Sequence, residues 1–178
     1  MSILHGDMRF YNNTFVQQDV PPFLREAEKS MRGGAWDDGN LDVGLKPYEG
    51  YMTEAEWKAQ FEGYCGMGAP ASDRYYVPLP VWAGGNLYFN GAFPWSKETG
   101  ARVMAGHADV AAVETDGGYA VRTNLAELVT ERAASPVSTD TLGMAFEPEE
   151  LYENPDGTPI TFAADYLNYF SGWTVTCR

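Results

Sequence analysis

The chain has 178 residues, which suits one domain with a core large enough to fold without disulfides or bound metal. Hydrophobic residues make up 44% of it and exclude a disordered chain, while 19 glycines and 11 prolines favour short β-strands joined by many turns. The formal net charge of −13 would repel nucleic acid and anionic membranes, so neither is expected as a partner.

Targeting and metal-binding patterns are absent from the sequence. The first ten residues lack the basic head and apolar run of a signal peptide, and no stretch approaches 18 consecutive apolar residues, so we expect a cytoplasmic protein. Cys65 and Cys177 show neither a CxxC pair nor zinc-finger spacing. They could form a disulfide or stay reduced, and we expect no cofactor and no metal centre.

The first strand-like stretch covers residues 8–16. Its aromatic and β-branched residues are interrupted by Asn12 and Asn13. Asparagine tolerates left-handed backbone and can pair its amide with a neighbouring layer, so this pattern suits the corner of a stacked β-coil. An ordinary edge strand followed by a turn fits equally well.

Two helices follow. Good helix formers predict one over residues 23–32, ended by a glycine pair, and residues 33–50 read as a loop. A capping box of Thr53 and Glu56 predicts the second helix over residues 53–64.

Apolar residues are most densely grouped in residues 81–95. Tyr88 and Phe89 lie between Gly-Gly-Asn at 84–86 and Asn-Gly at 90–91, which predict chain reversals on both sides of a short strand. We expect this stretch to be the centre of the core. The rest of the pattern predicts strands over 75–77, 101–105, 110–114 and 119–122, the last two joined as a hairpin across Asp116-Gly117-Gly118. After them we expect a short helix over 124–132, an extended stretch over 137–142, one helical turn over 149–154, a turn over 154–157, an extended stretch over 160–163 and an aromatic tail over 165–169.

Residues with ligand-binding chemistry form no complete motif. Asp38, Asn40, Asp42 and Glu49 have the spacing of an EF-hand calcium loop, but Val43 stands where the sharp turn needs glycine, so a solvated acidic loop is the alternative that we favour. The remaining carboxylates, histidines and cysteines form no recognisable catalytic arrangement.

Tryptophan side chains are the candidates for binding sugar rings. An aromatic face offers the apolar area that a sugar ring covers, and Trp36, Trp82 and Trp95 are the candidates for this role. Packing in the core is the more common role of such residues.

Four stretches together carry a family resemblance: residues 10–16, residues 85–92 followed by Pro94, residues 139–143 and residues 152–159. In this order they resemble the C-terminal part of bacterial right-handed parallel β-helix glycoside hydrolases of the β-xylosidase-like group. The resemblance spans nearly the whole chain but only the last third of a much longer enzyme. It implies a retaining mechanism with an aspartate nucleophile and a glutamate acid/base on earlier coils, so no catalytic residue is assigned here.

The expected fold is mainly β with a few short helices, built as terminal coils of a right-handed parallel β-helix plus an irregular β-rich C-terminal extension. We expect one domain over residues 1–178, with a β-helix coil at 1–20, a helical and loop insertion at 21–70 and a β-rich closing section at 71–178.

The expected function is that of a β-helix region of a glycoside hydrolase without its catalytic pair, either as a fragment or as a subunit. The alternative is a non-catalytic carbohydrate-binding or structural module. A terminal coil leaves apolar side chains and unpaired backbone groups exposed. We therefore expect a homo-oligomer or a partner chain with further coils that buries them.

Overall fold

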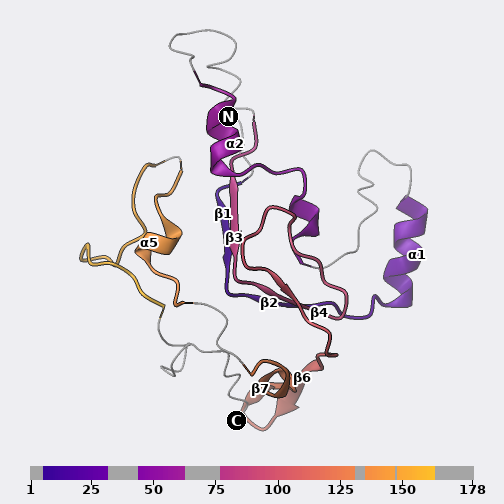
Figure 1. The fold of residues 1–178 in the computed structure, drawn as a ribbon. Helices are drawn as coiled ribbons and strands as arrows, with labels where there is room; N and C mark the ends of the chain where they lie inside the picture. Colours follow the sequence, from indigo (N-terminus) through magenta and orange to yellow (C-terminus); the bar gives the residue numbers. More distant parts are fainter. Residues whose placement is uncertain (1–5, 32–43, 63–76, 131–134, 147, 163–178) are drawn as a thin grey trace.

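The computed structural model describes residues 6–31, 44–62, 77–130, 135–146 and 148–162 (Figure 1). Over these ranges the protein is mainly β with a few short helices, as predicted. None of the helices there has the length and apolar character needed to cross a membrane. The division of the chain into three sections within one domain stays a prediction.

Five short strands form the centre of the fold, and all of their pairings are parallel. Each of two segments far apart in the sequence runs as strand, corner and strand, and the two lie side by side in Figure 1. β1 pairs with β3, β2 with β4, and β4 with β5. The strands are β1 (Met8–Tyr11), β2 (Thr14–Val16), β3 (Val81–Gly84), β4 (Leu87–Phe89) and β5 (Arg102–Val103).

The corners of these segments lie in register. Tyr11 pairs with Gly84 and Thr14 with Leu87, while Gly84 also bridges to Thr99. The residues that turn each corner are Asn12, Gly85 and Gly100, with φ of 57°, 68° and 70°. This left-handed conformation suits glycine and asparagine.

The predicted chain reversal at residues 84–86 is wrong. The chain turns a corner there, and β3 and β4 hydrogen-bond to different neighbours rather than to each other. Turn residues set the local bend, but the pairing with segments on either side decides where the following strand lies.

An amide network closes the middle corner. The Asn86 side chain is fully buried, and its Oδ1 accepts hydrogen bonds from the backbone nitrogen and Nδ2 of Asn13 at 2.8 and 3.0 Å. Its own Nδ2 donates to the Phe10 carbonyl at 2.8 Å and to Glu98 Oε1 at 2.7 Å. The amide pairing considered for a stacked coil is therefore present.

β4 is buried on both faces, which explains its continuous apolar sequence. Tyr88 faces a cluster with Val81 and Trp95, and its ring stacks on that of Phe15 at 5.2 Å. Leu87 and Phe89 face a second cluster on the opposite side. Burial, together with a hydrogen bond to Glu98, raises the pKa of the Tyr88 phenol above its ordinary value. The prediction that residues 81–95 form the centre of the core is confirmed.

The two predicted N-terminal helices are present as α1 (Pro22–Met31) and α2 (Glu54–Ala59), with a 3-10 turn η1 (Lys46–Tyr48) between them. The capping box of Thr53 and Glu56 is confirmed. α2 is shorter than predicted because the amide of Phe61 bonds to the carbonyl three residues back, which tightens the last turn.

The predicted hairpin is confirmed as β6 (Val110–Thr115) paired antiparallel with β7 (Gly118–Thr123). The predicted strand at 101–105 is reduced to β5, and the predicted helix at 124–132 to α4 (Leu125–Leu128). Asn124 precedes α4 but does not cap it with its side chain, which bonds to the loop before β6 at Asp109 N and His107 O instead.

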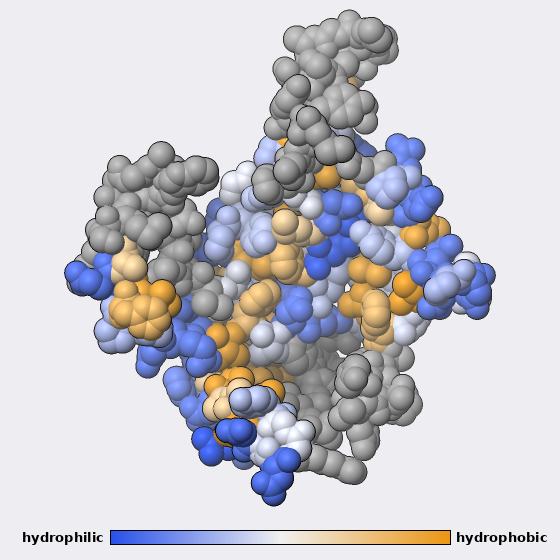
Figure 2. Space-filling model, turned by 180° about the vertical axis from the view of Figure 1, so that it is seen from behind, coloured by the Kyte–Doolittle hydropathy of each residue, from blue (hydrophilic) through white to orange (hydrophobic). Residues whose placement is uncertain are grey.

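Figure 2 shows apolar surface interrupted by polar groups on the face behind that of Figure 1.

Two predictions near the C-terminal end are wrong. Residues 137–142 contain the short helix α5 (Thr139–Leu142) because Ser138 caps it, accepting a hydrogen bond from the amide of Thr141. Residues 149–154 form no helical turn, because Leu151 bridges antiparallel to Met144 and Glu153 to Pro159.

The predicted turn at 154–157 is confirmed, and residues 160–162 run as extended chain that hydrogen-bonds to Val137 and to Thr139 at the start of α5. Residues 75–76, residue 163 and the predicted tail at 165–169 lie outside the described residues, and Val77 is not in a strand.

Candidate functional site

Arg9 and Trp82 lie side by side on the outward face of β1 and β3. They are register partners, and Val81 and Ala83 on either side of Trp82 are buried. Because side chains alternate along a strand, Trp82 and Arg9 share the opposite face. The Arg9 guanidinium lies 4.1 Å from the centre of the Trp82 ring and 4.9 Å from that of Tyr152.

Arg9 ties a distant segment to this face. Its Nε donates to the carbonyl of Leu142 at 2.7 Å and its Nη2 to that of Met144 at 2.6 Å. Nη1 donates to the Tyr152 hydroxyl at 3.1 Å and forms an ion pair with Asp7. Since the side chain is only 6% exposed, these bonds form in a partly dehydrated setting that strengthens them.

Asp7 completes the attachment. Its second carboxylate oxygen accepts a hydrogen bond from the amide of Phe146 at 3.0 Å. The Phe146 ring packs edge-on against Trp57 of α2, with the ring centres 4.7 Å apart. Residues 142–146 and Tyr152 are thus fixed between the strands and α2.

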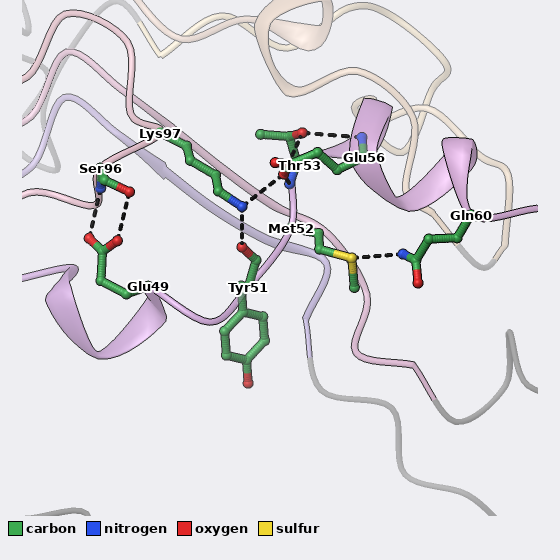
Figure 3. Close-up of polar contacts among 8 residues, drawn as sticks. All are labelled: Glu49, Tyr51, Met52, Thr53, Glu56, Gln60, Ser96 and Lys97. Carbon is green, nitrogen blue, oxygen red and sulfur yellow. Dashed lines mark hydrogen bonds and ion pairs between the residues drawn. The ribbon is translucent and has the colours of Figure 1, made fainter.

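α2 is anchored separately, through the segment that precedes it (Figure 3). Lys97 Nζ donates to the carbonyl of Tyr51 at 3.0 Å and pairs with Glu56 at 2.9 Å. The hydrogen bond from Lys97 is the largest cause that lowers the pKa of Glu56 to about 2, followed by the bonds from Thr53. Glu49 accepts hydrogen bonds from the amide and hydroxyl of Ser96 at 2.8 and 2.6 Å.

These three parts enclose a cleft of about 340 Å³. It has an aromatic floor, a charged rim, and one wall made of small and apolar residues. The lining residues are Arg9, Glu54, Trp57, Lys58, Trp82, Leu142, Gly143, Met144, Ala145, Phe146 and Glu149.

The rim of the cleft carries ionised groups. Lys58 lies 2.5 Å from Glu54, and its hydrogen bond is the largest cause that lowers the pKa of Glu54. The Trp82 side chain and the Arg9 charge lower that pKa further. Aromatic area beside hydrogen-bonding groups suits a small neutral ligand with both hydroxyl groups and apolar C–H faces.

A second, larger hollow of about 770 Å³ lies between the strands and the β6–β7 hairpin. His107 and Asp109 on its rim are 75% and 77% exposed, and among the described residues no aromatic ring other than the His107 imidazole lines it. It offers no tryptophan, tyrosine or phenylalanine face on which a ligand ring could stack, so the first cleft is the better candidate.

The three predicted sugar-stacking residues have different positions. Trp82 is half-buried and lines the first cleft. Trp95 is 2% exposed and packs in the core, which fits the alternative raised from the sequence. Trp36 lies outside the described residues.

The possible calcium loop is only partly within the structure. Asp38, Asn40 and Asp42 lie outside the described residues, as do Cys65 and Cys177. Glu49 is described, and both of its carboxylate oxygens bond to Ser96. In the part of the chain that the structure describes, no group of three acidic, histidine or cysteine side chains could hold a metal.

No motif in the sequence singles out Arg9, Glu54 or Glu149 as site residues. A signal for Arg9 existed, because a single arginine between Met8 and Phe10 in a strand must lie on the face opposite to theirs. Glu54 and Glu149 gave no comparable signal.

Comparison with known proteins gives one structural relationship. No family model matches the chain, and no curated protein matches it. A solved structure described as the complex of XylC with xylose matches at 25% sequence identity with a TM-score of 0.62. The match covers 93% of this chain and 23% of that chain, so this chain spans about a quarter of the length of the protein it matches. The chain therefore shares its fold with part of a protein that binds xylose.

Proposed function

We propose that the chain is the C-terminal β-helix region of a carbohydrate-active protein, and that its cleft binds a neutral sugar of the xylose class. The observation that carries this proposal is the structural match to the XylC complex over 93% of the chain. The stacked parallel strands with corners in register support the β-helix, and the aromatic floor with its polar rim supports a sugar as ligand.

In this proposal the cleft binds sugar and does not cleave it. A general acid for glycoside cleavage needs a carboxyl group with a raised pKa, whereas the Lys58 hydrogen bond lowers the pKa of Glu54. The catalytic pair that the β-xylosidase-like resemblance implies then belongs to coils outside this chain.

Titration with D-xylose, followed by NMR of the tryptophan indole signals, tests the binding. We expect the Trp82 signal to shift and the core Trp95 signal to stay in place. Replacement of Trp82 by Ala should abolish binding, while Tyr119→Ala, at an exposed aromatic on the hairpin, should leave it unchanged. Shifts spread equally over all the indoles would contradict the proposal.

Activity on aryl β-xylosides tests the missing catalytic pair. We expect no turnover by the chain alone. Turnover that survives rigorous purification would show that a catalytic pair is present in it.

Assembly through the outer edge of β1 and β2 is a second candidate function. Among the described residues, β1 pairs only with β3 and β2 only with β4, which leaves one edge of each unpaired. Asn13 is exposed at that corner, and no donor within the described ranges bonds to its Oδ1. An additional coil, from a second copy or from a partner chain, would continue the stack there.

Light scattering coupled to size-exclusion chromatography tests this assembly. We expect a mass above that of one chain, which should fall towards that of the monomer when the protein is diluted. A folded monomer at every concentration would contradict it.

A further inference from the structure

Glu149 occupies an unfavourable backbone conformation at the edge of the cleft. Its φ is 56°, in the left-handed region that side chains other than asparagine and aspartate seldom adopt. Three other non-glycine residues in the described ranges share this conformation: Asp7, Asn12 and Asn90.

The side chains of those three residues stabilise the fold directly. Asp7 binds Arg9 and the amide of Phe146, as described above. Asn12 donates to the carbonyl of Ser135 at 3.0 Å, and Asn90 exchanges two hydrogen bonds with the backbone of Ala108. Each bond gives a structural reason for the residue at that position.

Glu149 differs from them in its surroundings. Its backbone amide bonds to the carbonyl of Ala145 at 3.1 Å, but its exposed carboxylate makes no hydrogen bond or ion pair with any described residue. Glu149 is one of the residues that line the cleft, together with Trp82 and Glu54. Glycine would adopt this backbone with less strain, so the fold gives no reason for a glutamate here.

We infer that Glu149 is a sugar-contacting residue, whose carboxylate accepts hydrogen bonds from ring hydroxyls of the ligand bound over the aromatic floor. This inference rests on the proposed function of the cleft. The left-handed backbone persists at this position because it presents the carboxylate at the rim, and strain of this kind gathers at binding sites. A carboxylate that accepts two hydroxyl donors suits the vicinal hydroxyls of a neutral sugar.

Three variants separate this role from a structural one. Glu149→Gly removes the carboxylate and relieves the strain, so the melting temperature should rise while the affinity for D-xylose falls about tenfold, in line with the loss of a charged hydrogen bond. Glu149→Gln keeps an oxygen acceptor without the charge and should lose less affinity. Glu150→Gln removes the same charge from the adjacent exposed residue, outside the cleft lining, and should bind like the parent protein.

Titration calorimetry of the four proteins with D-xylose decides the question, with thermal melts to confirm folding. A parent protein that binds, together with weakened Glu149→Gly and unchanged Glu150→Gln, supports the role. A parent protein that binds and Glu149 variants that bind equally well overturn this inference alone. A parent protein that does not bind overturns the proposed function and this inference with it.

Discussion

The stacked strands and the β6–β7 hairpin place apolar side chains in opposite surroundings. β4 has three residues and all of them are fully buried, whereas β6 and β7 have six residues each and no buried position. Tyr119 and Val121 of the hairpin are 79% and 51% exposed. Strand length therefore says little about where stability arises; the packing on both faces of β4 decides it.

The largest expected effect tests that contrast in the core. Leu87→Ala should lower the free energy of unfolding by about 3 kcal/mol, because it leaves a cavity at a position with no exposed surface. Val121→Ala in the hairpin should lower it by less than about 0.5 kcal/mol. Equilibrium unfolding in urea measures both, and similar losses would refute the contrast.

A second test concerns the corners. Asn86→Ala should cost about 2 kcal/mol, because Asn13 and the Phe10 carbonyl would lose buried partners. Asn154 also bonds through its amide, to Thr158, but in an exposed turn. Asn154→Ala should therefore cost well under half as much in the same urea experiment, and a reversed order would contradict the role of the buried amide.

Weakening the attachment of residues 142–146 and Tyr152 to the strands should cost less stability than either core change. Lysine cannot reproduce the five-donor fork of arginine, so Arg9→Lys should weaken this segment by about 1 kcal/mol. Faster hydrogen exchange at the amides of Ala145 and Phe146 would report it. Arg122→Lys on the exposed hairpin is the control, and exchange rates unchanged by Arg9→Lys would show that other contacts hold the segment.

The smallest expected effect is a pH dependence at the start of α2. The folded-state pKa of Glu56 is about 2, below its ordinary value of 4.5, so its bonds to Lys97 and Thr53 stabilise the fold fully above pH 4.5. This stabilisation should disappear as the pH falls from 4.5 through 2.

Comparison with Glu56→Gln isolates the effect. The stability difference between the parent and this variant should shrink over that pH range, as measured by thermal melts. Glu153→Gln, at another exposed glutamate, should show a difference from the parent that changes less with pH. A constant difference for Glu56→Gln would mean that ionisation of Glu56, through its bonds to Lys97 and Thr53, does not stabilise the fold.

Part of the candidate site could be predicted from the sequence. Trp82 was a candidate because its ring can cover a sugar, and its alternation with Val81 and Ala83 places it on the outward face. Trp95 has the same chemistry, but core packing covers it, and composition alone cannot distinguish the two. Arg9 and Leu142 are 133 positions apart, so no local pattern could show that they bond.

Local chemistry is what the sequence by itself determined. The capping box at Thr53, the β6–β7 hairpin turn and the turn at 154–157 form as predicted, since their hydrogen bonds join residues a few positions apart. The Ser138 cap follows the same rule. Its hydrogen bond to Thr141 is local, so helix α5 could have been predicted from the sequence.

Only the tertiary structure decided how the strands pair and where the cleft lies. Asn13 and Asn86 are 73 positions apart, and their strands align because parallel stacking buries β4 on both faces and pairs the corner amides. The same burial explains why the chain turns a corner at Gly84–Asn86 instead of reversing, since β3 and β4 each pair with another strand. Turn residues allow a bend, but long-range burial selects the partner of each strand.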